Sequence, residues 1–238
     1  QQLTASRFSQ PGELVKWMGA IQAQDYAMSK WAIGSRLTTG NEAAIESAID
    51  KGEIIRTHIM RPTWHVVASS DCRWMLQLTA PNIKRLARTQ EKQLGLDDAI
   101  FRKTNRLITK LLEGRQMTRA EIMTELWKSR LSMNSLQAAH VMLHAELDQI
   151  VCNGARRGKQ FTYAVFDERI PASRPIPRDQ ALNELATRYF TSHGPAMLTD
   201  FVWWSGLSIT DARTGLEAAK RNLQSAKIDG VDYWHAGE

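Results

Sequence analysis

The sequence has 238 residues, of which 43% are hydrophobic and 24% are charged, proportions typical of a globular protein with one large or two modest domains. Its two cysteines, Cys72 and Cys152, lie far apart and form no CxxC pair, which excludes a common zinc module and a disulfide framework. The sequence has no apolar run long enough for a membrane span and no signal-peptide pattern, so we expect a cytoplasmic protein.

The net charge of +6 is concentrated in one part of the chain. Residues 56–130 hold fifteen Lys and Arg against seven Asp and Glu, a local charge of +8, whereas residues 1–55 and 131–238 each come to −1. A regional excess of this kind is typical of a surface that binds a polyanion such as nucleic acid. The alternative is a set of solvated helix faces.

The first 80 residues predict three helices followed by two short strands. Asn41 is a good helix cap, and Gly52 is a good helix terminator. The expected helices run from Pro11 to the polar pair Gln22 and Gln24, over 26–37 and over 41–51, and the expected strands cover 54–61 and 63–68. Three helices and a β hairpin form the outline of a winged helix.

Two further helices are expected after this unit. Ser70 or Asp71 is expected to cap a helix over 72–79, and Pro81 is expected to open the next one. On that second helix three cations recur every four residues on one face: Lys84, Arg88 and Lys92. This stripe is a candidate phosphate contact surface, and its alternative is a solvated helix face.

The same outline of three helices and a hairpin occurs twice more. The second set has helices over 97–115, 117–127 and 134–150, with Thr118 and Glu121 as a capping box. The hairpin that follows has a basic tip formed by Arg156, Arg157 and Lys159. The third set has helices over 179–192, 198–204 and 210–223, and a hairpin over 226–234 with an Asp-Gly turn.

These patterns predict a mainly α protein with small β wings, in the α+β class, built from tandem winged-helix units. The expected parts are winged helix 1 (1–80), a basic linker helix (81–96), winged helix 2 (97–167) and winged helix 3 (178–238). We expect the third unit to be shortened at its C-terminal end.

Four stretches carry a resemblance to a known family. They are 19–25 (GAIQAQD), 31–37 (WAIGSRL), 56–68 (RTHIMRPTWHVVA) with Asp71, Arg73 and Trp74, and 194–207 (GPAMLTDFVWWSGL). In this order they resemble the bacterial AlkZ-like winged-helix DNA glycosylases, the relatives of the azinomycin-resistance glycosylase. Family members usually continue with a further C-terminal portion that this sequence lacks.

The resemblance implies three winged helices around a channel for duplex DNA. It also implies excision of N-alkylated purines, in some members from interstrand cross-links. The catalytic motif of the family is Gln, an apolar residue, then Gln or Asp, which places it here at Gln22, Ala23 and Gln24. The expected protein is therefore a monofunctional DNA glycosylase, a hydrolase of DNA repair that acts on alkylation damage in duplex DNA as a monomer and without a cofactor.

The chemistry of an amide limits what this motif can do. A glutamine amide is neutral and cannot act as a base, but its carbonyl oxygen can orient a water and face a developing cation. Residues two apart do not share a face of a helix, so a catalytic role requires an extended or turn conformation. We expect Gln24 to orient the water and Gln22 to contact sugar or water; the alternative is two surface amides.

Other polar residues are weaker candidates. Arg61, Thr63 and His65 alternate onto one strand face if Pro62 adds no bulge, and they are expected to contact phosphate or sugar, or else to support the first unit. His140 and His144 have the spacing of a metal pair, but His140 falls on an apolar helix face and no third ligand is evident. We therefore expect core histidines and no metal.

Two other functional classes remain open. A non-catalytic winged-helix DNA-binding protein or transcription regulator would present its helices to paired half-sites, usually as a dimer. An interaction module that binds protein is a third interpretation, and the local charge of +8 argues against it. Three units in one chain with a polar pair at a helix end favour a monomeric enzyme.

Overall fold

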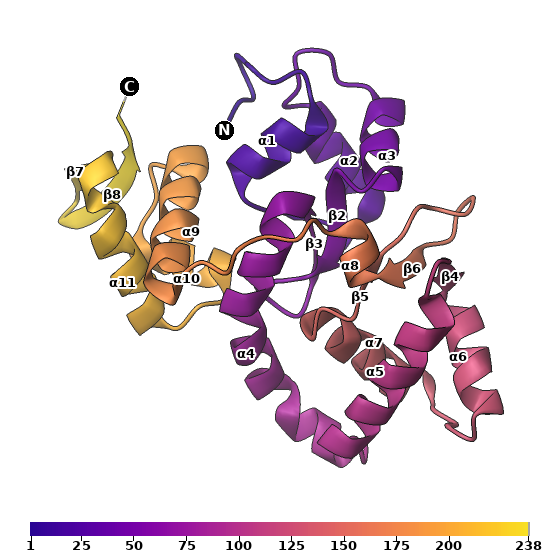
Figure 1. The fold of residues 1–238 in the computed structure, drawn as a ribbon. Helices are drawn as coiled ribbons and strands as arrows, with labels where there is room; N and C mark the ends of the chain where they lie inside the picture. Colours follow the sequence, from indigo (N-terminus) through magenta and orange to yellow (C-terminus); the bar gives the residue numbers. More distant parts are fainter. Residues whose placement is uncertain (238) are drawn as a thin grey trace.

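The computed structural model describes residues 1–237 and has the expected α+β class, with helices and three small antiparallel sheets. Figure 1 shows three groups of elements in chain order, coloured indigo to purple, magenta, and orange to yellow. We name them unit 1 (11–68), unit 2 (98–165) and unit 3 (178–236). In units 1 and 2 the order is helix, strand, helix, helix, strand, strand.

Unit 1 begins at Pro11 and contains the polar pair. Its elements are α1 (Pro11–Met18), β1 (Ile21–Gln22), α2 (Tyr26–Gly34), α3 (Glu42–Asp50), β2 (Ile54–His58) and β3 (Trp64–Ala68), with strand order β1-β3-β2. The Asn41 side chain accepts a hydrogen bond of 2.8 Å from the Ala43 N–H, so the expected cap is confirmed. The first helix is shorter than expected, because it ends before Gly19, whose φ of +79° breaks the helix.

A single helix, α4 (Ser69–Gln93), follows unit 1 and replaces the two expected helices. Pro81 lies inside it, so the expected break at this residue is wrong. The expected cap is also wrong, because Asp71 lies in the first turn of α4 and its buried carboxylate pairs with Arg188. Packing of α4 against α7 and α9 supports the helix on both sides of Pro81.

Unit 2 repeats the order of unit 1. Its elements are α5 (Asp98–Leu112), β4 (Met117–Thr118), α6 (Arg119–Lys128), α7 (Ser135–Leu147), β5 (Val151–Asn153) and β6 (Thr162–Val165), with strand order β4-β6-β5. The capping box is confirmed: Glu121 accepts from the Thr118 N–H at 2.7 Å, and Thr118 Oγ1 accepts from the Glu121 N–H at 3.3 Å. A short helix, α8 (Phe166–Arg169), follows the unit directly.

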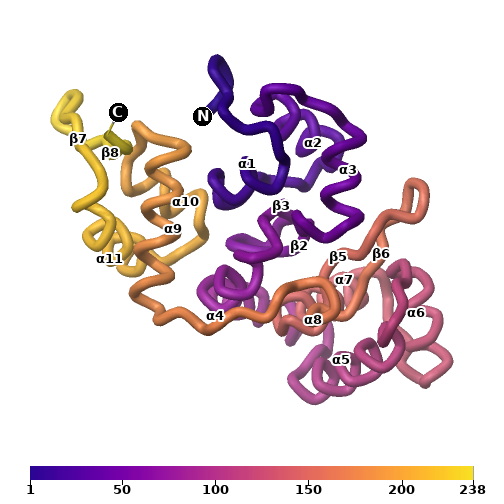
Figure 2. The backbone as a smooth tube through the Cα atoms, turned by 45° about the horizontal axis from the view of Figure 1, so that its top comes forward, coloured from indigo at the N-terminus to yellow at the C-terminus, as the bar shows by residue number. Residues whose placement is uncertain are grey.

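Unit 3 follows an extended segment that runs along α4 (Figure 2). Its elements are α9 (Arg178–His193), α10 (Leu198–Ser205), α11 (Ile209–Ala219), η1 (Lys220–Asn222), β7 (Leu223–Ile228) and β8 (Val231–Ala236). An isolated bridge between Ala196 and Trp234 stands where the other units have their first strand. Asp229 and Gly230 have φ values of +49° and +80°, as the expected Asp-Gly hairpin turn requires.

The hydrophobic core does not divide at the unit boundaries. Two clusters lie mainly within unit 1 and unit 2, but a third joins β2, α4, α7, α9 and α11. Unit 3 therefore shares its core with unit 1 and with α4. The division into winged helices at 1–80, 97–167 and 178–238 with a linker at 81–96 stays a prediction. No helix within residues 1–237 combines the length and hydropathy needed to cross a membrane.

A buried ion pair joins α4 to unit 3 and gives a test of this shared core. Arg188 contacts both carboxylate oxygens of Asp71 at 2.5 and 3.2 Å, and the Trp74 indole N–H donates to Asp71 at 3.1 Å. Asp71→Ala removes the buried carboxylate of this pair and leaves Arg188 with the half-exposed Glu184, whose Oε1 lies 2.7 Å from Arg188 Nε. We therefore expect this variant to lower the free energy of unfolding by about 3 kcal/mol in urea titrations, the lower end of the range for a broken buried pair.

The matched control is Asp167→Ala, which removes the exposed partner of Arg73. Exposed pairs contribute little, so this variant should lose at most about 1 kcal/mol. Equal losses in the two variants would show that the Asp71 pair is not a specific link between α4 and unit 3.

Candidate active site

The polar pair lies on a strand. Ile21 and Gln22 pair with Val66 and His65 of β3, and the Ala23 N–H donates to the Trp64 carbonyl at 2.7 Å. The expected helix over this segment is wrong, and the segment has the extended geometry that a catalytic role requires. Pairing with β3 begins after Gly19, where a Cβ would lie 3.3 Å from the Trp204 ring.

Both amides are exposed: Gln22 ends β1, and Gln24 lies two residues beyond it, after the backbone bond of Ala23 to β3. Ile21 and Ala23 are buried, whereas Gln22 and Gln24 are exposed, as alternation along a strand requires. Gln24 Oε1 accepts a long hydrogen bond of 3.4 Å from the Trp64 N–H. An amide carbonyl has two lone pairs, so this contact orients Gln24 and leaves one acceptor site for a water.

A buried arginine supports the motif from the opposite face. Arg56 is 6% exposed, and its Nε donates to the Ala23 carbonyl at 3.1 Å. Its guanidinium lies between two rings, 4.1 Å from the Trp64 centroid and 4.5 Å from that of Phe161. Burial lowers the pKa of Arg56, and the nearby Glu146 carboxylate opposes that shift. Arg56 thus fixes the backbone between the two glutamines.

Glu146 of α7 holds the neighbouring strand. Its side chain is fully buried, and Oε2 accepts from Thr57 Oγ1 at 3.0 Å, from the His58 N–H at 2.7 Å and from His58 Nδ1 at 2.9 Å. Oε1 has no hydrogen-bond partner among the residues that the structure describes. Because Glu146 belongs to unit 2 and Thr57 to unit 1, this carboxylate fixes the two units to each other.

Three residues that support the motif were not predicted from the sequence: Arg56, Glu146 and Phe161. Each of the two charged residues has a signal in the sequence: Arg56 interrupts the apolar start of β2, and Glu146 interrupts the apolar run of α7. A charge inside an apolar segment indicates a buried, paired group. The partners themselves lie 33 and 88 to 89 residues away, so spacing along the chain could not identify them.

The expected contact of His65 with phosphate or sugar is contradicted by its burial. His65 is 1% exposed and lies opposite both Gln22 and Thr57 in the sheet, so the three side chains share a face. Its Nδ1–H donates to the Thr63 carbonyl at 3.0 Å. Burial is the main cause of the low pKa of His65, which is about 4; the charge of Arg61 adds to the shift and the hydrogen bond to the Thr63 carbonyl opposes it, so the ring is neutral at pH 7.

Arg61 and Thr63 lie in the loop between β2 and β3, so the expected alternation along a strand is wrong. The Thr63 N–H donates to the Arg61 carbonyl at 2.7 Å in a tight turn around Pro62. The Arg61 guanidinium lies 4.4 Å from the Trp203 ring centroid. Arg61 Nε and Thr63 Oγ1 are buried and have no hydrogen-bond partner within the described part of the chain.

The basic stripe of α4 is partly neutralised. Lys84 forms an ion pair with Asp148, and Arg88 pairs with Asp98 at 3.0 Å. Lys92 is exposed and has no ion pair in residues 1–237. Asp98 lies on α5, and Asp148 caps the C-terminal end of α7. Helix α7 packs against α4, and α5 packs against α7.

The basic tip of the unit 2 hairpin is also mostly occupied. The Arg156 N–H donates to Asp50 at 2.9 Å, and its guanidinium contacts Glu46 at 3.2 Å and covers the Tyr26 ring at 4.7 Å. Arg156 therefore attaches unit 2 to unit 1.

The other two cations of the tip differ from each other. Arg157 pairs with Glu121 at 2.7 Å and donates to the Gln116 carbonyl at 2.8 Å. Lys159 is exposed, and it makes no ion pair in the part of the chain that is described. It is the cation of the tip that is open to a phosphate.

The two histidines of α7 are core residues, as expected. Both are buried and share Glu91 of α4, which lies 2.8 Å from His144 Nε2 and 3.4 Å from His140 Nδ1. The His144 ring stacks on Phe101 with 3.6 Å between centroids. Burial lowers the pKa of His144, and Glu91 opposes that shift.

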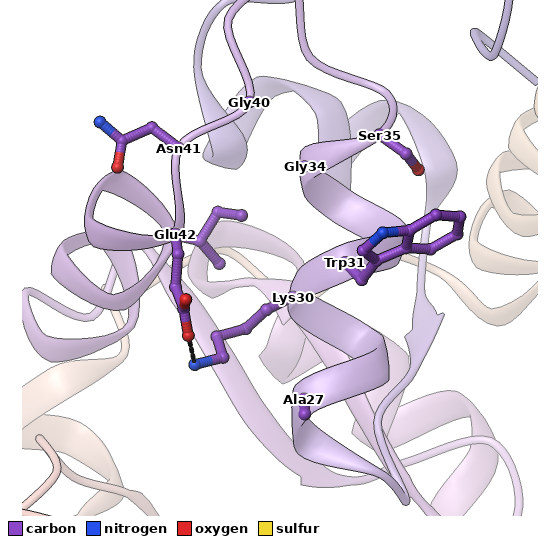
Figure 3. A pocket seen from close by; sticks show the side chains of 9 residues that line it. Ala27, Lys30, Trp31, Gly34, Ser35, Gly40, Asn41 and Glu42 are labelled. Carbon is purple, nitrogen blue, oxygen red and sulfur yellow. Dashed lines mark hydrogen bonds and ion pairs between the residues drawn. The ribbon is translucent and has the colours of Figure 1, made fainter.

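A cavity of about 440 Å³ lies between α2 and α3 (Figure 3). In the figure Lys30 extends toward Glu42, whereas Trp31 extends away from this pair. Lys30 also contacts Glu46 at 2.6 Å, so its charge is compensated by two carboxylates. Gln22 and Gln24 do not line this cavity.

The comparisons with known proteins agree with this architecture. The protein has three helical units with small sheets, and it presents one exposed pair of glutamines at Gln22 and Gln24. It is an α+β protein, as the sequence predicts. The chain belongs to the DNA glycosylase AlkZ-like family, whose model matches residues 15–238. The resemblance found in the sequence is therefore confirmed.

Two similar proteins come from Streptomyces sahachiroi. The interstrand DNA cross-link repair glycosylase is 21% identical over 206 residues, which cover 83% of this chain and 55% of the relative. The solved structure of the DNA glycosylase AlkZ matches with a TM-score of 0.84 at 18% identity, over 99% of this chain and 66% of that one. The chain thus spans about half the length of the curated relative, and the structural likeness shows a common fold.

The support of the motif by Arg56 predicts a specific loss of stability. Arg56→Lys keeps the charge but cannot stack between two rings or donate from Nε, so we expect about 1–3 kcal/mol less unfolding free energy in urea. The control is Arg213→Lys on the exposed face of α11, which should change stability by at most about 0.5 kcal/mol. Similar losses in both variants would contradict the role of Arg56.

The neutral His65 predicts a pH dependence of stability. Its pKa is about 4 in the folded protein and about 6.5 when unfolded, so the unfolded chain takes up a proton first as the pH falls. The stabilisation is complete above pH 6.5 and is lost as the pH falls toward 4, by about 3 kcal/mol at most. His65→Asn should flatten this dependence in urea titrations; an unchanged dependence would show that other groups cause it.

Proposed function

We propose that this chain is a monofunctional DNA glycosylase that hydrolyses the N-glycosidic bond of alkylated purines in duplex DNA. The observation that carries the proposal is the extended motif, in which Gln22 at the end of β1 and Gln24 two residues later are both exposed on either side of the buried Ala23. Membership of the AlkZ-like family supports it, as does a curated relative whose name includes interstrand cross-link repair.

The reaction suits neutral amides. An alkylated purine carries a positive charge and is a good leaving group, so the protein has little need of a general acid. Bond breaking develops positive charge on the sugar, as in glycoside hydrolysis. A carbonyl oxygen of each glutamine can face that charge, and one can hold the attacking water without taking its proton. No cofactor is needed for this step.

The two glutamines are expected to differ in role. Gln24 is oriented by the Trp64 N–H, and the Ala23 backbone between the two residues is held by Arg56 and β3. A preorganised dipole stabilises a developing charge without a cost of reorientation during the reaction. We therefore assign Gln24 to the water and Gln22 to the sugar or to the same water.

The binding of duplex DNA is proposed to use cations that have no carboxylate partner in the described residues, and cations whose ion pairs are exposed. Lys92 and Lys159 have no ion pair in residues 1–237, and Arg61 lies in the loop before β3. The Arg88 pair with Asp98 is exposed on both sides, and such pairs contribute at most about 1 kcal/mol. A phosphate can therefore replace the Asp98 carboxylate at little cost.

The test is the release of base from a duplex that contains one N7-methylguanine. We expect the wild-type protein to release it, and we expect the double variant Gln22→Ala, Gln24→Ala to be about 100-fold slower or more in single turnover, the range known for loss of a preorganised polar group. A cross-linked duplex serves as a second substrate, because the relative is named for that activity.

The matched control removes two other exposed glutamines, Gln90 and Gln180, and should keep the wild-type rate. Base release that survives in the motif variant would remove the catalytic assignment. Binding of the duplex by the wild type without base release would favour the non-catalytic DNA-binding function.

A further inference from the structure

The tryptophans of the chain fall into two groups by exposure. Five of the eight are buried or partly buried, while Trp31, Trp127 and Trp203 are 68%, 66% and 69% exposed. An indole has a large, rigid apolar face and a polar N–H, which makes an exposed tryptophan well suited to contact a ligand. The surroundings of each exposed tryptophan decide whether it is placed to do so.

Each exposed tryptophan lies on the second helix of its unit. Trp31 lies on α2, Trp127 on α6 and Trp203 on α10. Trp31 and Trp203 both come six residues after the helix N-cap, and Trp127 comes nine residues after it, one helical turn later. The same helix is thus exposed in each unit, but the surroundings of the three indoles differ.

Trp203 alone is attached to the loop that leads to the candidate site. The Arg61 guanidinium lies 4.4 Å from the Trp203 ring centroid. Trp64, whose N–H donates to Gln24, follows Arg61 by three residues. Arg61 also lies near enough to His65 to lower its pKa, and His65 shares a sheet face with Gln22. The Trp203 indole and the Gln24 amide are therefore linked through one segment, which runs from Arg61 to Trp64.

The position of α10 on this loop is fixed by backbone contacts. Asn82 Nδ2 of α4 donates to the Gly206 carbonyl at 2.6 Å. Gly206 has a φ of +67°, and a Cβ on it would lie 2.3 Å from the Met60 carbonyl oxygen. Only glycine allows this approach, so Trp203 is held in a set position relative to loop 59–63.

We propose that Trp203 is a base-stacking residue that contacts a nucleobase of the duplex next to the nucleotide held at Gln22 and Gln24. The proposal rests on the proposed function for the identity of the ligand. An exposed indole with a cation against its ring offers a flat apolar surface beside a positive charge, which suits a base and its phosphate. Aromatic and apolar side chains that enter a base stack also assist extrusion of a nucleotide.

The experiment measures duplex binding in the Gln22→Ala, Gln24→Ala background, so that no substrate is consumed. The probe is a duplex with one N7-methylguanine and 2-aminopurine as its neighbour, whose fluorescence reports unstacking. Trp203→Ala should bind about 5- to 100-fold more weakly and lose most of the 2-aminopurine signal, as the loss of one stacked aromatic predicts. Trp203→Phe should keep most of both.

The salt dependence separates stacking from phosphate contacts. Loss of an indole removes no cation, so the slope of log Kd against log salt should be the same in Trp203→Ala as in the parent. Trp127→Ala is the matched control, since this indole is as exposed but lies in unit 2, and it should leave affinity and signal unchanged. Thermal unfolding checks that each variant is folded.

The outcomes distinguish this inference from the proposed function. Equal affinity and signal in Trp203→Ala and its parent, or equal losses in Trp203→Ala and Trp127→Ala, would overturn base stacking while leaving base release by the wild type intact. Binding that depends on Trp203 but is not followed by base release in the wild type would support stacking and overturn the glycosylase proposal.

Discussion

The pairing of residues 21–23 with β3 is the constraint on which the candidate site depends. In a helix the side chains two residues apart point in different directions, whereas along a strand they share a face. The hydrogen bond from Ala23 to the Trp64 carbonyl and the contact of Arg56 with the Ala23 carbonyl use both polar groups of the central residue. The backbone between the two glutamines is therefore fixed, and only their side chains remain free to meet a ligand.

The support for this strand comes from all three units. Phe161 of unit 2 covers one side of Arg56, and Glu146 of unit 2 holds β2 through Thr57 and His58. Unit 3 reaches α4 through the pair of Arg188 with Asp71. The exposed motif lies in unit 1, but the groups that fix it are buried at the contacts between units. A unit 1 cut from the chain would lose these supports.

The parts of the fold that were predictable from the sequence are those set by local chemistry. The Asn41 cap, the Thr118 and Glu121 capping box and the Asp229-Gly230 turn depend on neighbours within a few residues, and each has the expected geometry. Local rules predict a helix boundary at Pro81, but α4 continues through this residue because tertiary packing supports the helix there. The motif was identified by resemblance to a family, while its strand conformation depends on β3, more than 40 residues later.

The distribution of charge shows why composition alone could not define the proposed DNA-binding face. Four of the predicted phosphate contacts are paired: Lys84 with Asp148, Arg88 with Asp98, Arg156 with Glu46 and Arg157 with Glu121. Lys84 and Arg73 lie within 56–130, but their carboxylate partners, Asp148 and Asp167, lie outside it, so the local excess of +8 is lower in space than along the chain. A phosphate could displace Asp98 from Arg88 more easily than Glu46 from Arg156. The Arg88 pair is exposed, whereas the Arg156 pair is packed against Tyr26. A duplex at this face must therefore gain affinity from the cations that remain open, from exchange of the exposed pairs, and from contacts that carry no charge.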